Sequence, residues 1–189
     1  MPENQQEHLK KLLTEQENLS NGWLDYWQQW SHMGTWQFWA LVAMIVVPLV
    51  SLYFLIDKKK ALLIGFFGFN IHVWFTYADI VGARFGMWSY PFQAIPFLTV
   101  SFGLDASLVP VAFMLVYQWT IHSKRNSYLY LGALSAFFSF ALKPFLVSIH
   151  LFQLHKWATY FHLFIFYILI FSISLWITKI FLFFEEKKG

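Results

Sequence analysis

Two charged residues, Asp105 and Lys143, lie well inside apolar stretches that are long enough to cross a lipid bilayer. Asp105 belongs to the stretch Phe97–Gln118, and Lys143 belongs to Tyr128–Ile149. An ionisable group inside a membrane span costs about 2.5–3.5 kcal/mol on insertion scales, so it normally has a partner or a function. In two antiparallel helices these charges would lie roughly 12 and 10 Å from the same end. The matched depth predicts a direct salt bridge.

Other polar residues fall on the helix faces that carry this pair. Because lipid cannot satisfy polar groups, such stripes normally face protein or water. The pattern therefore predicts a shared polar interior in the outer half of the bundle, open toward the outer membrane face. The candidate residues of an ion or solute pathway are Asp105, Lys143, His72, Asp79, Ser139, Ser101 and His150, with Thr76 and Ser135 on the same stripes.

Prolines follow both central charges. Pro110 would leave the carbonyl of Ala106 without its helical donor, and Pro144 would do the same to Phe140. Transporters use such weakened helices to expose backbone groups to an ion or substrate. Because prolines are common in membrane helices, a simple packing kink is the alternative.

Structural roles for the charges remain open alternatives. Asp105 and Lys143 could form a neutralised pair that only fixes helix register. The Lys143 side chain could also extend along its stem toward the interface. Asp79 and Arg84 are predicted to form a solvated pair near the interface.

Recognisable catalytic and metal-binding signatures are absent. The chain has no cysteine, which excludes disulfides and thiolate sites. A zinc site could use three of His72, His150, His155 and His162 together with Asp79, and a histidine could also bind haem iron. Their spacing matches no established ligand pattern, so no metal or cofactor is assigned. A lysine beside an aspartate in an aromatic pocket could support Schiff-base chemistry.

Composition indicates a membrane protein, because hydrophobic residues make up 58% of the chain and charged residues 12%. Soluble proteins average about 25% charged residues. The basic residues are scattered among loops, which argues against nucleic-acid binding. We predict an all-α integral membrane bundle over residues 36–189, with an amphipathic segment before it. Its five apolar stretches are Trp36–Ile56, Ala61–Val81, Phe97–Gln118, Tyr128–Ile149 and Tyr160–Phe184.

Basic residues predict the orientation. If each stretch crosses once, eight of the thirteen Lys and Arg residues fall on the side of the C-terminus and four on the side of the N-terminus. The positive-inside rule then places the C-terminus in the cytoplasm and the N-terminus outside the cell membrane.

The N-terminal segment, residues 1–35, is polar and precedes the first apolar run, so no cleavable signal peptide is expected. Its leucines and tryptophans form an approximate helical stripe, which favours an interfacial amphipathic helix. Ser20–Gly22 is predicted to interrupt this helix. The loop Gly82–Pro96 is expected to rest on the membrane interface through its aromatic residues.

A resemblance covers a third of the chain, from Asp57 to Trp119. Its motifs are DKKKALLIGFFGFNIHVWFTYAD, MWSYP, IPF and SFGLDASLVPVAFMLVYQW. This part resembles an uncharacterised family of small multi-pass membrane proteins of spore-forming Gram-positive bacteria. The resemblance implies membrane location and topology, and it implies no particular chemistry.

The leading functional hypothesis is a small transport or permeation component that handles a proton, ion or small polar solute. One alternative is a binding or sensory subunit of a larger membrane complex. Another is a membrane-embedded enzyme that acts on a lipid or isoprenoid. Five helices are few for a transporter that works alone, so a homo-oligomer or larger complex is expected.

Overall fold

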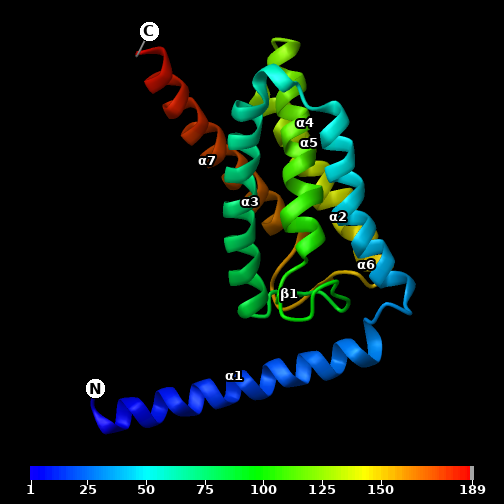
Figure 1. Ribbon diagram of the computed structural model, residues 1–189, viewed down its shortest axis with the longest axis vertical. Helices are drawn as coiled ribbons and strands as arrows, with labels where there is room; N and C mark the ends of the chain where they lie inside the picture. Colours follow the sequence, from blue (N-terminus) through cyan, green and yellow to red (C-terminus); the bar gives the residue numbers. More distant parts are fainter. Residues whose placement is uncertain (188–189) are drawn as a thin grey trace.

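A computed structural model describes residues 1–187 as a helical bundle with one long helix across its end (Figure 1). In this part of the chain, five helical segments are long and apolar enough to span a bilayer. The all-α membrane bundle predicted from the sequence is confirmed. The spans are α2 (Trp36–Leu55), α3 (Ala61–Arg84), η2–α4 (Leu104–Leu108 and Val109–His122), α5–η3–α6 (Ser127–Phe137, Phe138–Leu142 and Lys143–Ser148) and α7 (Tyr160–Glu186).

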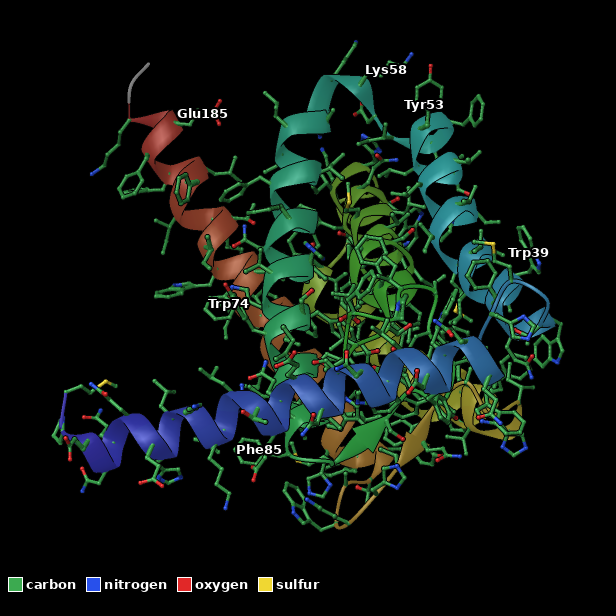
Figure 2. All side chains as sticks on the ribbon, turned by 60° about the horizontal axis from the view of Figure 1, so that its bottom comes forward. Trp39, Tyr53, Lys58, Trp74, Phe85 and Glu185 are labelled. Atoms are coloured by element: carbon green, nitrogen blue, oxygen red, sulfur yellow. The ribbon has the colours of Figure 1, made fainter. Side chains whose placement is uncertain are left out.

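Helix α1 (Glu3–Trp30) lies across one end of the bundle, nearly perpendicular to the bundle helices (Figure 1). We call this end the α1 end. Phe85 lies at the α1 end, whereas Tyr53, Lys58 and Glu185 lie toward the other end (Figure 2). The opposite end includes the short turn η1 (Lys58–Lys60), where the basic residues between the first two spans gather.

The connection between α1 and the bundle is held by Gln93. Its backbone N–H donates to Ser31 Oγ at 2.8 Å, and its carbonyl accepts from Ser31 Oγ at 3.0 Å and from Trp27 Nε1 at 2.8 Å. No residue of α1 is buried. Only the C-terminal part of α1 is therefore fixed by these bonds.

Two connections at the α1 end fold over the bundle and pair with each other. We call them the cap: residues 85–101 and residues 149–159. Strand β1 (Trp88–Ser89) pairs antiparallel with β2 (Gln153–Leu154). The Met87 carbonyl accepts the His155 N–H at 2.8 Å, and the Ser89 hydroxyl lies 2.7 Å from His155 Nε2.

Aromatic side chains fill the bundle interior. Tyr167 of α7 stacks on Phe75 of α3 at 5.2 Å between ring centroids and on Phe113 of α4 at 6.3 Å. Phe67 and Tyr117 approach to 4.3 Å nearer the opposite end. These buried rings hold α3, α4 and α7 together around the polar residues described below.

Three sequence expectations about the elements are wrong. Ser20–Gly22 does not interrupt α1, which is continuous. The third span does not begin at Phe97, because residues 97–101 belong to the cap and are not helical. The aromatic loop does not rest on the interface, because Trp88 and Tyr90 are 5% and 2% exposed and point into the bundle.

Candidate functional site

Asp79, Asp105 and Lys143 form a cluster in the half of the bundle nearer α1, and we call it the buried charge cluster. Their exposed fractions are 4%, 2% and 2%. Each comes from a different span, α3, η2 and α6, and all three are close enough to interact electrostatically. The cluster therefore brings together the two charges singled out from the sequence and adds a second carboxyl group.

Asp79 is held by the cap. Its Oδ1 accepts the indole N–H of Trp88 at 2.6 Å and the hydroxyl of Tyr90 at 2.8 Å. Gly82 makes this possible, since a Cβ there would overlap the Trp88 ring one turn above Asp79. The solvated pair of Asp79 with Arg84 predicted from the sequence is wrong, because the cap closes over α3 and buries Asp79 while Arg84 stays exposed.

Lys143 lies between aromatic groups of the cap. Its Nζ is 3.8 Å from the Phe152 ring centroid and 5.3 Å from that of Tyr90, and it donates to the Tyr90 hydroxyl at 3.4 Å. Ammonium groups are attracted to the negative faces of such rings. Among residues 1–187, no carboxylate oxygen lies within 4.0 Å of Lys143 Nζ. The direct Asp105–Lys143 salt bridge is therefore wrong, and a Lys143 side chain extended to the interface is also wrong.

Asp105 and Lys143 each lie at a π-helical turn within their span. Asp105 is in the π-helical turn η2, and Lys143 directly follows the π-helical turn η3. π-Helical turns inside α-helices occur frequently at functional sites. In η2 the Val109 N–H bonds to the Leu104 carbonyl, five residues back. In that register Pro110 faces the Asp105 carbonyl and has no N–H to donate.

His72 satisfies that carbonyl. Its Nδ1 lies 2.8 Å from the Asp105 backbone oxygen. Because a carbonyl only accepts, Nδ1 carries the proton in this bond. The carbonyl freed by Pro110 is thus that of Asp105 and not Ala106, and His72 joins the surroundings of the cluster as the sequence predicted. Helix α2 fixes η2 from the side away from His72. It packs closely against Gly103, and its Ile45 carbonyl accepts from Ser107 Oγ at 2.7 Å.

Several polar atoms in and around the cluster have no hydrogen-bond partner within residues 1–187. Asp79 Oδ2, both carboxyl oxygens of Asp105, Ser101 Oγ, Ser139 Oγ and Tyr167 OH are buried and have no hydrogen-bond partner among the described residues. Fully ionised, two carboxylates and one ammonium leave one net negative charge. A buried net charge is costly, so the cluster favours an added proton or cation.

A small cavity adjoins these groups, and we call it the inner cavity. It measures about 20 Å³ and is lined by Asp79, Lys143, Trp88 and Tyr167 together with apolar side chains of α3 and α7. A water molecule needs about 10–15 Å³ in this measure. The inner cavity therefore has room for about one water-sized group, which is too little for a water-filled channel.

Of the remaining predicted pathway residues, some lie near the buried charge cluster and one lies outside it. Ser101 and Ser139 are buried near the cluster, whereas His150 is exposed in the cap and lies outside it. His155 pairs with Ser89, and His162 caps α7 through Thr159. In the part of the chain that the structure describes, no three His, Asp or Glu side chains are grouped to hold a metal ion.

Sequence reasoning missed the aromatic residues that surround the charges: Trp88, Tyr90, Phe152 and Tyr167. Burial raises the pKa of the Tyr90 hydroxyl well above its usual value, and the carboxylates Asp79 and Asp105 raise it further. Tyr90 is thus kept protonated and able to donate. The signal available in the sequence was the motif MWSYP, whose two aromatic side chains could have been assigned to a buried polar partner.

Comparison with known proteins does not assign this site. Searches found no matching family model, no matching curated protein and no matching solved structure. The resemblance to a family of spore-forming bacteria remains a prediction, and function is argued from the geometry alone.

Proposed function

We propose that this integral membrane protein is a small transport or permeation component in which the buried charge cluster binds and releases a proton or a monovalent cation. The observation that supports this most directly is the charge balance of the cluster. Two carboxyl groups and one lysine are buried together, and three of the four carboxyl oxygens have no hydrogen-bond partner within the described part of the chain. One added positive charge neutralises the group.

A proton fits the site better than a hydrated ion. The inner cavity has room for about one water-sized group, and a cation that enters it must lose most of its hydration shell. Asp79 and Asp105 are close enough to interact electrostatically, so a proton on one carboxyl group removes its repulsion of the other. His72 is the next histidine or charged residue along α3 toward the opposite end, about 10 Å from Asp79 along the helix axis.

Orientation follows from the basic residues. Lys58, Lys59 and Lys60 lie at the end opposite α1, together with the loop that contains Lys124 and Arg125. We infer that this end faces the cytoplasm and that α1 lies along the outer surface of the cell membrane. The cap would then separate the cluster from the outside.

Purified protein in liposomes tests the transport proposal. A potassium gradient with valinomycin sets the membrane potential, and a trapped pH-sensitive dye reports proton entry. Wild type should carry protons faster than protein-free liposomes, and Asp79→Asn and Asp105→Asn should each remove most of this flux. Arg84→Gln is the matched control, because Arg84 is exposed at the end of the same helix. The proposal fails if wild-type flux equals that of protein-free liposomes, or if both aspartate variants carry protons like wild type.

A further inference from the structure

The side of the bundle between α3 and α7 carries an apolar groove next to the charge cluster. The groove measures about 290 Å³ and is lined from α3 by Trp74, Tyr77 and Val81 and from α7 by Leu169 and Ile173. These five side chains are all exposed on the outside of the bundle, where a bilayer would lie. Trp74 projects from α3 on the side of α7 (Figure 2).

The groove and the inner cavity are neighbours. Ala78, Phe166 and Ile170 line both spaces, so these side chains lie between the lipid-facing groove and the cavity that Asp79 lines. By contrast, the α1 end is closed by the cap, where Trp88, Tyr90 and Phe152 are each 5% exposed or less. The nearest approach to the cluster for a molecule dissolved in the bilayer is therefore sideways, between α3 and α7.

The chemistry at the inner end selects for a cation. Asp79 Oδ2 and Tyr167 OH have no partner among the described residues, and the aromatic rings of Trp88, Phe166 and Tyr167 line the inner cavity. Carboxylates and aromatic faces together are the usual surroundings of a bound ammonium group. Lys143 also lines the inner cavity, with its Nζ 3.8 Å from the Phe152 ring centroid, and its one positive charge leaves one of the two carboxylates unbalanced.

We propose that this site binds a membrane-dissolved primary amine, with its apolar chain in the groove between α3 and α7 and its ammonium group in the inner cavity beside Asp79. This inference rests on the proposed function and gives its cation a chemical class. An apolar chain fits a groove of apolar side chains, and the ammonium supplies the positive charge that the cluster needs. The same amine loaded at Asp79 would be the cargo of the transport component.

The size of the inner cavity makes the proposal specific. An ammonium nitrogen occupies about the space of a water molecule, which a cavity of about 20 Å³ can hold. A trimethylammonium group is several times larger and would have to displace Trp88 or Tyr167. An alcohol of equal chain length fits by size and carries no charge. Comparing the binding of a primary amine, a quaternary amine and an alcohol with the same chain therefore separates the effects of head-group charge, head-group size and the apolar chain.

The test is equilibrium binding of radiolabelled dodecylamine to the full chain in lipid nanodiscs at neutral pH. We expect saturable binding of one amine per chain, displaced by unlabelled dodecylamine and at least tenfold less well by dodecyltrimethylammonium or dodecanol. Asp79→Asn should weaken binding at least tenfold. Ala78→Phe, which fills the passage between groove and cavity, should do the same.

Leu62→Phe is the matched control, because it adds a ring to α3 at a position that is 91% exposed and far from the groove. It should bind like wild type. Non-saturable uptake that is equal in wild type, Asp79→Asn and Ala78→Phe would overturn the proposal, as would equal competition by all three dodecyl compounds. If the amine fails to bind while wild-type proton flux in liposomes persists and depends on Asp79, the amine assignment alone is wrong. If both fail, the proposed function fails with it.

Discussion

Tyr90→Phe removes one hydroxyl group that joins the cap to the buried charge cluster. The hydroxyl donates to Asp79 Oδ1 at 2.8 Å and accepts from Lys143 Nζ at 3.4 Å. Hydrogen bonds to charged groups contribute about 1.5–3 kcal/mol in soluble proteins, while those measured between membrane helices average about 0.6 and reach about 1.7. Because Tyr90 is fully buried and serves both charges, we expect a loss of about 1.5 kcal/mol in the free energy of unfolding.

The assay is reversible unfolding in mixed detergent micelles at neutral pH, with Tyr53→Phe as the matched control. Tyr53 is 75% exposed, so its substitution should change stability by less than about 0.5 kcal/mol. In the Asp79→Ala background the acceptor is absent, and Tyr90→Phe should cost less than half as much. Additive losses within about 0.5 kcal/mol would refute the direct contact and, with it, the assignment of the cap as the support of Asp79.

Three other predictions concern residues outside the buried charge cluster. Gly82→Ala should destabilise the protein by about 1–3 kcal/mol in the same unfolding assay, because its Cβ would overlap Trp88, whereas Gly65→Ala in the same helix meets nothing within 4 Å and should be neutral or stabilising. Ser31→Ala should leave the buried Gln93 N–H without its partner and loosen the attachment of α1. We expect faster hydrogen exchange at Gln93 and faster proteolysis between Trp30 and Trp36, and unchanged protection would contradict the docking role of Ser31. The backbone N–H of Lys59 and then His122 lower the pKa of Asp57, so its contribution to stability is complete above about pH 4 and declines as the pH falls through the lowered pKa; His122→Ala should reduce this pH dependence.

The spans could be predicted from the sequence because a transmembrane helix satisfies its own backbone and needs only apolar length. The error at the third span has the same origin. Phe97–Ser101 continues the apolar run of the third span, yet it lies in the non-helical cap after Pro91 and Pro96, where Val100 is buried against the bundle instead of lipid and Phe97 is exposed. Hydropathy measures the cost of leaving water and does not distinguish these two destinations. In α1, the cost of about 1 kcal/mol for Gly22 is too small to interrupt a helix of 28 residues.

The candidate site was only partly predictable, for a related reason. Position along the helices correctly predicted that Asp105 and Lys143 lie in the same region. The same reasoning assigned Asp79 to the interface, because position along a helix does not reveal that the cap folds back over α3. Proline positions indicate that both helices are weakened, but the register of the freed carbonyls depends on the π-helical turns, which hydrophobic periodicity does not reveal. The Tyr90 hydroxyl and the Phe152 ring take the place of the expected carboxylate beside the Lys143 ammonium.

The two oxygens of Asp79 have different surroundings, and under the proposed function this couples loading of the site to the cap. Oδ1 accepts from Trp88 and Tyr90, both in the cap, while Oδ2 has no partner among the described residues and belongs to a side chain that lines the inner cavity. A proton on Oδ2 makes the carboxyl group neutral, and hydrogen bonds to neutral acceptors contribute about 0.5–1.5 kcal/mol instead of about 1.5–3. Two such bonds would weaken together by about 2–3 kcal/mol, which shifts the equilibrium between closed and open cap by about one to two powers of ten toward the open form. The charge that enters beside α7 would thereby loosen the contact that closes the outer end, and this gives a five-span protein a way to alternate access without a continuous pore.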